Sequence, residues 1–260
     1  MSSTESPLLP AGKVVFVTGG SGHLGSEFAL SMSAAGAKVV IGGRNVERLR
    51  ATAQRIQTAT GNEVRYVSGD LTNAGGIPQL VDDAWAAFDR VDAIVNSAVP
   101  AGSPQEGDLM STPDDAWLRF FDPVVLGVLR LGQNLAPKMA EIGGGSFINV
   151  VSPTGMVPSP GVDAYGIAKG ALIMLTKYMA REWGVWNIRA NGLSPGLIVD
   201  DQYVTPKTIP KNVALSAALE RTSLARWGRP EDLVGVATFL ASDAAAFISG
   251  QVITVDGGRF

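Results

Sequence analysis

The chain has 260 residues, of which 46% are hydrophobic, and a formal net charge of −3. This composition fits one α/β domain with a sizeable core and excludes a disordered chain. The chain contains no cysteine, so disulfides, thiol catalysis and cysteine-ligated zinc are excluded, and we predict no metal site. The absence of a strong basic run argues against nucleic acid and anionic membranes as partners.

The first eleven residues are polar and contain prolines, and we interpret residues 1–11 as a flexible leader. They lack the charged and apolar regions of a signal peptide. No run approaches the roughly 20 apolar residues of a membrane span. We therefore predict a cytoplasmic protein with one domain over residues 12–260.

The first predicted elements are a strand, a glycine-rich turn and a helix. Val14–Thr18 is a short β-branched run, typical of a buried strand. The sequence GGSGHLG follows at residues 19–25, and a helix is expected over 26–35. Glycines let the backbone approach a pyrophosphate, and the helix N-terminus attracts the anion. This arrangement predicts a dinucleotide phosphate site.

The second predicted strand, 39–41, ends just before Gly43 and Arg44. An NAD-preferring site places an acid about 20 residues after the glycine turn, to hold the ribose 2′-hydroxyl. An arginine can instead pair with a 2′-phosphate through its fork of donors. The pattern favours NADP, while NAD remains possible if Arg44 is only a solvated residue before the next helix.

The middle of the chain continues the alternation of strands and helices. Asp70 follows the third strand, and Asn96-Ser97-Ala98-Val99 follows the fourth. A Gly/Pro-rich loop then leads into a long helical region, which Pro123 interrupts. The third and fourth strands, the helices before them and the long helical region are expected at 45–59, 64–68, 76–88, 91–95 and 114–142.

Three polar side chains follow the fifth predicted strand, 147–151. Ser152 comes directly after it, and Tyr165 and Lys169 lie at i and i+4, so on a helix spanning 164–184 they share one face. Open α/β sheets bind ligands at the carboxyl ends of their strands. A lysine cation beside a tyrosine is expected to lower the pKa of the phenol from its usual value of about 10. The group is suited to proton transfer.

The last third of the chain supplies two more strands, at 188–193 and 251–255, and a helix at 230–241. We interpret residues 197–226 as a mobile substrate lid. The seven strands and six helical stretches predict one doubly wound parallel sheet of the Rossmann type, with helices on both faces.

From Lys13 to Gly258 the chain resembles the short-chain dehydrogenase/reductase family, with its glycine turn and its serine followed by Tyr-x-x-x-Lys. The resemblance implies that Ser152, Tyr165 and Lys169 are catalytic. It implies that Asp70 contacts the adenine, with helix capping as the alternative, and that Pro195, Gly196 and Ile198 face the nicotinamide. The implied cofactor site comprises Gly19, Ser21, Gly22, His23, Leu24, Gly25, Arg44, Asp70, Leu71, Asn96, Ala98, Tyr165, Lys169, Pro195, Gly196 and Ile198.

The chain departs from the family pattern at three positions. His23 replaces a glycine of the turn, either as a phosphate donor or as a tolerated loop residue. Val99 replaces a glycine after the fourth strand. Val124 stands where an asparagine of the family helps to hold a water that relays protons to the lysine.

The preferred interpretation is an NADP(H)-dependent oxidoreductase that interconverts a carbonyl and a secondary alcohol on a small organic substrate. Pro153, Thr154, Met156, Val157 and residues 183–186 suggest an apolar pocket, with a place in the core or in an interface as the alternative for some of them. The alternatives are a lyase, isomerase or cyclase on the same fold, and a cofactor-binding regulatory protein without turnover. The resemblance also implies a homotetramer, with a dimer as the fallback.

Overall fold

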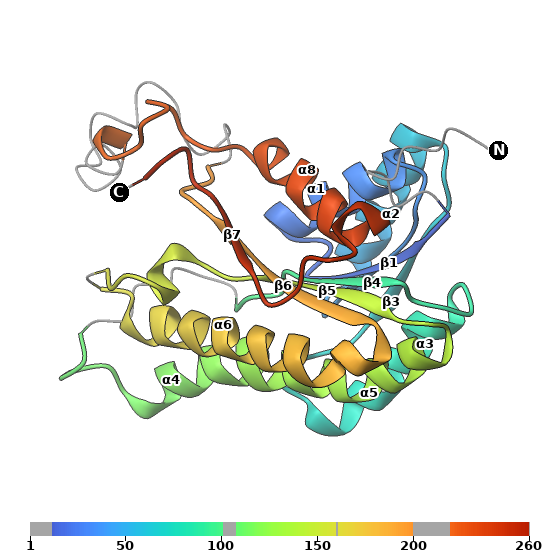
Figure 1. Cartoon of the computed structure of the whole chain (residues 1–260), viewed down its shortest axis with the longest axis horizontal. Coiled ribbons are helices and arrows are strands. Elements are labelled where there is room, and N and C mark those ends of the chain that lie inside the picture. Colours follow the sequence, from blue (N-terminus) through green and yellow to red (C-terminus); the bar gives the residue numbers. More distant parts are fainter. Residues whose placement is uncertain (1–11, 101–107, 160, 200–218, 260) are drawn as a thin grey trace.

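The computed structural model of the chain describes residues 12–100, 108–159, 161–199 and 219–259 (Figure 1). The predicted leader and residues 200–218 of the predicted lid lie outside the described residues. The described residues form one seven-stranded sheet in the order β3-β2-β1-β4-β5-β6-β7. Its strands are β1 (Val14–Thr18), β2 (Lys38–Gly43), β3 (Val64–Ser68), β4 (Ala93–Asn96), β5 (Gly145–Val150), β6 (Ile188–Pro195) and β7 (Val252–Val255).

All six strand pairs are parallel, as predicted. The strand order reverses at β1, which pairs with β2 on one side and with β4 on the other. Thr18 lies opposite Gly42 of β2 and Asn96 of β4, so the ends of these strands are level. This reversal is the place where an open α/β sheet binds its ligand.

Helices cover both faces of the sheet (Figure 1). One layer consists of α1 (His23–Ala34), α2 (Val46–Thr60) and α8 (Glu231–Ala241). The other consists of α3 (Ile77–Ala86), α4 (Asp114–Phe121), α5 (Gly127–Glu141) and α6 (Asp163–Trp183). Short 3-10 turns are η1 (Ala74–Gly76), η3 (Pro153–Gly155), η4 (Gly184–Trp186) and η6 (Asp243–Ala245). The predicted fold class is confirmed.

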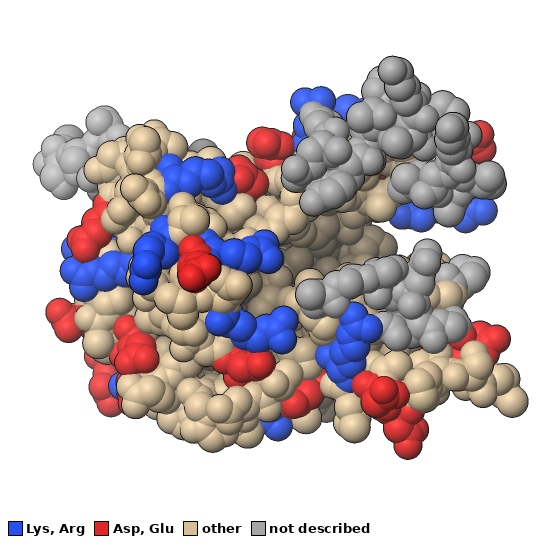
Figure 2. All heavy atoms as spheres, turned by 180° about the vertical axis from the view of Figure 1, so that it is seen from behind, with Lys and Arg blue, Asp and Glu red and all other residues tan. Residues whose placement is uncertain are grey.

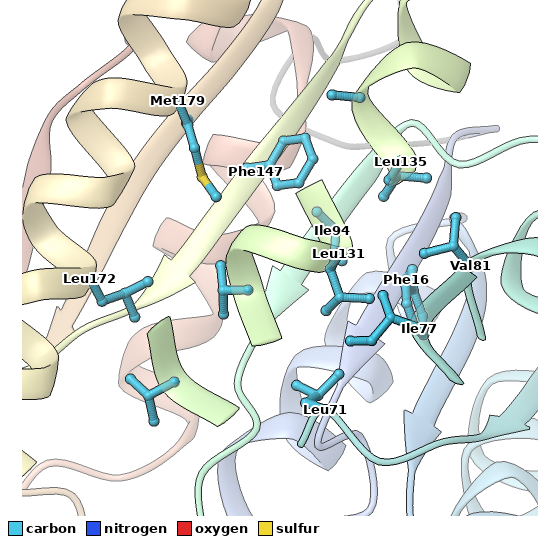
Figure 3. Close-up of a cluster of buried hydrophobic side chains, with 14 of the residues drawn as sticks. Phe16, Leu71, Ile77, Val81, Ile94, Leu131, Leu135, Phe147, Leu172 and Met179 are labelled. Carbon is cyan, nitrogen blue, oxygen red and sulfur yellow. The ribbon is translucent and has the colours of Figure 1, made fainter. Parts of the chain in front are cut away.

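Each layer has its own hydrophobic core, because alternate strand residues point to opposite faces. Phe16 and Phe147 point to the side of α5 and α6, where Leu131 and Met179 pack against the sheet (Figure 3). Val15 and Val17 point to the other side, toward Phe28 of α1. Because both faces are covered, the central strands β1 and β4 are buried and apolar up to their last residue, whereas the edge strand β3 carries exposed residues such as Arg65.

The long helical region is one path with a widened turn in the middle. A π-helical turn, η2 (Asp122–Leu126), joins α4 to α5, and the Gly127 amide donates to the Asp122 carbonyl. Pro123 has no amide hydrogen and cannot donate to the carbonyl four residues earlier. The hydrogen bonding therefore shifts by one residue, and the proline widens the helix where the sequence predicted an interruption.

The start of the first helix differs from the prediction. Helix α1 begins at His23, three residues earlier than expected, because Gly22 adopts an extended conformation and serves as the N-cap. The glycine-rich turn is therefore only four residues long before the helix starts. Among the described residues, no helix is both long and apolar enough to cross a membrane.

Candidate active site

Three strands end in polar groups that have no partner. Among the described residues, Thr18 Oγ1, Asn96 Oδ1 and Ser194 Oγ are buried without a hydrogen bond. They belong to the carboxyl ends of β1, β4 and β6. Buried polar groups nearly always have partners, so an unpaired set at one edge indicates a place for a ligand. Figure 2 shows a deep hollow in the molecular surface, and the visible floor is formed by uncharged residues.

The glycine-rich turn is held so closely that side chains are excluded. Gly19 has a φ of +65°, and a Cβ there would lie 2.8 Å from the Ala98 Cα. A Cβ on Gly25 would lie 2.2 Å from the Gly19 carbonyl oxygen. The turn is fixed to the sheet by the Gly20 amide, which donates to the Gly42 carbonyl at 3.1 Å. This cradle fits the pyrophosphate of a nicotinamide dinucleotide.

His23 occupies the first position of α1 and is exposed. It is absent from the positive-φ residues, so the backbone does not require glycine at this position. The replacement of the family glycine is therefore accommodated by the start of the helix. Leu24 is half-buried, packs against the core on the α1 side and contributes no polar group.

The end of β4 belongs to a buried chain of amides. Asn96 Nδ2 donates to Asn149 Oδ1 at 2.8 Å, and Asn149 Nδ2 donates to Thr176 Oγ1 at 2.8 Å. The chain links β4, β5 and α6 beneath the edge of the hollow. It fixes the Asn96 amide so that its unpaired Oδ1 has a defined direction. Ala98 is half-buried and close to Gly19, which places both beside the glycine turn.

The end of β2 carries the groups that the sequence linked to cofactor choice. An added Cβ on Gly43 would lie 3.8 Å from Ser21 Oγ, which is an ordinary contact. The surrounding atoms therefore do not exclude a side chain at this position. The Arg44 side chain is 61% exposed, and its Nη1 lies 3.9 Å from Asp70 Oδ2. Asp70 Oδ1 accepts from the amide and the hydroxyl of Thr72. Asp70 thus closes a turn after β3 and does not cap a helix, because the N-caps of η1 and α3 are Asn73 and Gly76.

Ser152 and Tyr165 come together as the sequence predicts. Ser152 is 7% exposed directly after β5, and its hydroxyl lies close enough to the Tyr165 phenol to oppose the rise of the phenol pKa. The Thr154 hydroxyl lies 2.9 Å from Ser152 Oγ, and the Thr154 amide donates to the same oxygen at 3.3 Å. The ring of Tyr165 packs edge-on against Phe120 at 5.7 Å between centroids. Thr154 thus extends the polar set by a second hydroxyl.

Lys169 joins this set from one turn further along α6. It is 2% exposed, and its Nζ donates to the Val150 carbonyl at 2.6 Å. The ammonium lies 5.7 Å from the centroid of the Tyr165 ring. Burial lowers the pKa of Lys169 from its usual value to about 7, and no carboxylate of the described residues offsets the loss of water.

The pKa of Tyr165 differs from the sequence-based expectation. We expected the lysine to lower it, but burial raises the pKa of the phenol, and the Ser152 hydroxyl only partly opposes this. The loss of water around the phenol outweighs the interactions that favour the phenolate. Tyr165 is therefore protonated at neutral pH in this structure.

The β6 end and the loop after it supply the last predicted contacts. The Gly196 amide donates to the Val255 carbonyl at 2.9 Å, and a Cβ on Gly196 would lie 2.5 Å from the Asp256 Cα. Pro195 ends β6, and Ile198 forms a bridge with Gly228. A pocket of about 180 Å³ lies here, lined in part by Gly196, Ile198 and Trp227.

Two of the residues considered for the sites have side chains in or against the core. Leu71, from the implied cofactor site, is 7% exposed, and its side chain packs inward in the hydrophobic core. Trp183 packs on Phe147, with 5.2 Å between centroids. It lies 18 residues after Tyr165 on one helix, about 27 Å away. Residues 183–186 therefore do not line the substrate pocket.

Known proteins share both the sequence pattern and the fold of this chain. The family model described as enoyl-(acyl carrier protein) reductase matches residues 21–259. A 3-oxoacyl-(acyl-carrier-protein) reductase of Thermotoga maritima is 32% identical over 249 residues, covering 95% of this chain and 97% of that protein. A solved gluconate 5-dehydrogenase of Burkholderia cenocepacia, in complex with NADP and tartrate, has a TM-score of 0.88 at 30% identity and covers 97% of this chain and 96% of that one.

A second solved structure is a 7α-hydroxysteroid dehydrogenase complexed with NADH and 7-oxo glycochenodeoxycholic acid. It has a TM-score of 0.86 at 30% identity and covers 97% of this chain and 96% of that one. The chain belongs to the short-chain dehydrogenase/reductase family. Within that family it is a nicotinamide-dependent oxidoreductase of the class that interconverts carbonyls and alcohols, as predicted.

Proposed function

We propose that this enzyme uses NADPH to reduce the carbonyl group of a small organic molecule, with Tyr165 as the proton donor. The observation that carries the proposal is the convergence of Ser152, Tyr165 and Lys169 at the strand edge that also holds the unpaired groups. The glycine cradle and the unpaired Asn96 Oδ1 fit a dinucleotide beside this set.

The proposed roles follow from the chemistry of each side chain. When bound, the cofactor supplies the hydride that adds to the carbonyl carbon. The carbonyl π bond breaks, and the oxygen takes the phenolic proton of Tyr165. The Ser152 hydroxyl donates a hydrogen bond to that oxygen and orients it. Lys169 holds the nicotinamide ribose and, with its pKa near 7, can return a proton to the phenolate.

The resting state of Tyr165 suits a proton donor. Burial raises the pKa of the phenol, so the side chain carries its proton at neutral pH. In the reverse reaction, alcohol oxidation, the phenolate of the same residue would act as the base.

The preference for NADP is proposed from Gly43 and Arg44. The two solved relatives bind NADP in one case and NADH in the other, so the choice rests on this chain's own residues. No carboxylate is present at Gly43 to bind the ribose 2′-hydroxyl, and Arg44 next to it is largely exposed to solvent and to a ligand. A guanidinium in this position favours a 2′-phosphate.

Arg44→Ala tests this preference. The affinity for NADPH should fall by about 1–3 kcal/mol, the size of a lost charge-assisted hydrogen bond, while NADH binding stays nearly unchanged. Fluorescence titration of both cofactors measures the effect. Wild-type protein that binds NADH as tightly as NADPH would disprove the preference itself.

The substrate is proposed to be apolar next to its carbonyl. Met156 and Val157, in the loop after Ser152, are 47% and 67% exposed, and Val99 after β4 is also exposed. Exposed apolar side chains beside a site commonly mark the surface that an apolar ligand covers. A panel of apolar ketones and polyhydroxylated ketones, followed by NADPH absorbance, tests this. Faster turnover of the polyhydroxylated set would contradict it.

Assembly is proposed from the outer face of α6. Ile167, Met174 and Tyr178 are exposed and spaced so that they share one helix face. Phe247, between η6 and β7, is fully exposed as well. Such surfaces favour a homotetramer, with a dimer as the fallback. Light scattering that finds a stable monomer at micromolar concentration would reject both. The cytoplasmic location stays a prediction.

A further inference from the structure

The first turn of α2 carries a second arginine at the predicted 2′-phosphate position. Arg48 Nη2 donates to the Ser21 carbonyl of the glycine-rich turn at 3.1 Å. Its own amide donates to Asn45 Oδ1, which caps the helix. Ser21 in turn lies beside Gly43, where an added Cβ would be 3.8 Å from Ser21 Oγ. Arg48 therefore bridges the glycine-rich turn and the start of α2 around the open space at Gly43.

The charge of Arg48 is not balanced by a carboxylate. Within the described ranges it makes no ion pair, and its guanidinium is exposed. Its position in the first helical turn is unfavourable for a cation, because the helix N-terminus already carries partial positive charge. A dianion bound there would offset both charges.

Arg44 alone matches the 2′-phosphate poorly. At neutral pH the phosphate monoester carries a charge of about −1.5 to −2. Arg44 brings one positive charge and lies 3.9 Å from the carboxylate of Asp70, which offsets part of it. Arg48 supplies the missing positive charge, from a different element and with a fork of donors of which one already contacts Ser21.

We propose that Arg48 is a second specificity-determining residue that clamps the 2′-phosphate of NADP between the glycine-rich turn and α2. The inference rests on the proposed NADP preference and goes beyond it. Because Arg48 already holds Ser21, the turn is positioned before the cofactor arrives, and binding needs little rearrangement. Arg48 thus couples recognition of the 2′-phosphate to the shape of the pyrophosphate cradle.

The test compares the binding of four probes to full-length protein without turnover: NADPH, NADH, 2′,5′-ADP and 5′-AMP. Arg48→Gln keeps a donor for the Ser21 carbonyl but loses the charge. It should weaken NADPH and 2′,5′-ADP roughly tenfold or more, the loss expected for one charge-assisted hydrogen bond. NADH and 5′-AMP should change less than twofold. Arg50→Gln is the matched control, because Arg50 lies on the same helix and contacts the Tyr66 hydroxyl.

A second readout is the pH dependence of 2′,5′-ADP binding. The phosphate loses one negative charge below a pKa of about 6. Wild-type affinity should therefore fall from pH 7.5 to pH 5.5, and Arg48→Gln should flatten this dependence. The other charged or titratable groups of the described surroundings include Arg44, Asp70, Glu47 and His23 of the glycine-rich turn, and they are unchanged in the variant.

Three results would overturn the inference. Arg48→Gln protein that binds NADPH as wild type does would remove Arg48 from the site, while the preference of wild type for NADPH would still stand. Equal weakening of NADPH and NADH would mean that Arg48 only supports the turn. Unchanged pH dependence would likewise place it away from the phosphate. A wild-type protein without preference for NADPH would instead refute the proposed function, and that result is visible before any variant is made.

Discussion

Polar groups are buried without partners at one edge of the sheet and are largely paired at the other. At the carboxyl edge, Thr18, Asn96 and Ser194 keep buried oxygens without partners. At the amino edge the charges are paired: Asp92 accepts from the Val14 amide at 2.7 Å and binds Arg90, and Lys13 pairs with Asp243 at 3.1 Å. A pocket of about 150 Å³ at the amino edge is lined by these groups, whose charges are largely neutralised.

Arg189 is the exception at the amino edge. Its Nη2 donates to the Ser242 carbonyl, while Nη1 is buried without a partner among the described residues, and burial lowers the pKa of the guanidinium. The comparison teaches that a pocket alone does not identify a site. The buried unpaired groups beside Ser152, Tyr165 and Lys169 distinguish the proposed active-site edge of the sheet from the opposite edge, where polar groups stabilise the fold.

The strongest way to break the comparison is Tyr165→Phe at the carboxyl edge. Loss of the proton donor should lower turnover by about 10²–10⁴-fold while NADPH affinity stays near wild type. Steady-state kinetics and cofactor titration measure the two effects separately. Tyr66→Phe, at an exposed position of the edge strand β3, is the control and should change neither. Near wild-type turnover of Tyr165→Phe would refute the assignment.

Lys169→Met should make the protein less active but more stable. The folded pKa of Lys169 lies near 7, below the unfolded value, so the unfolded state binds more protons between about pH 7 and 10.5. The lysine is thus most destabilising at and below pH 7, and the penalty fades as pH rises. A gain of several kcal/mol is expected at pH 7, since each pKa unit corresponds to about 1.4 kcal/mol.

Urea denaturation at pH 7 and pH 9.5 measures this gain, which should shrink at the higher pH. Lys177→Met, an exposed lysine of α6, serves as the control and should be nearly neutral. A gain in stability that is the same at both pH values would contradict the depressed pKa.

Asp92→Ala tests the amino edge. It removes the acceptor of the buried Val14 amide and one partner of Arg90, so the free energy of unfolding should fall by about 2 kcal/mol. KM and kcat at permissive temperature should remain close to wild type, because the edge takes no part in the reaction. Asp243→Ala, which breaks an exposed pair, should cost less than about 0.5 kcal/mol. A catalytic defect in folded Asp92→Ala protein would erase the distinction between the edges.

The smallest effect is expected at Thr154. Thr154→Val removes the hydroxyl that contacts Ser152 while keeping the shape, and should lower kcat a few-fold, the value of about one net hydrogen bond. Thr154→Ser should restore the wild-type rate. If Thr154 only supported the turn, both variants would change stability and leave kcat unaltered.

Much of the fold and the proposed reactive set could be predicted from local pattern. Apolar runs with glycine or polar ends located the strands, and the spacing of Tyr165 and Lys169 placed both on one helix face. Arg48 was missed because its contact with Ser21 joins two elements that are distant in sequence. The only sign of this role in the sequence is that Arg48 stands in the first turn of a helix, where cations are disfavoured.

The environment of the site could not be predicted, because burial depends on the packed whole. Spacing alone suggested that Lys169 lowers the pKa of Tyr165, but both groups are largely removed from water. Val124 is 1% exposed in the core with Phe120 and Leu172, so an asparagine there would bury an amide among apolar groups. The replacement thus suits its surroundings, whatever its effect on a proton relay.

Because α8 packs against α1, one face of α1 stays uncovered until the end of translation. Leu233, Ala237 and Leu240 of α8 share a core cluster with Phe28 and Met32 of α1, yet residues 35–230 lie between the two helices. A ribosome releases α1 and its strands long before α8 exists, so this apolar face stays open to water during most of translation. A chain that ends before Glu231 would contain β1 to β6 but would leave the apolar face of α1 exposed to water. Chaperones and proteases act on chains with such exposed apolar surface.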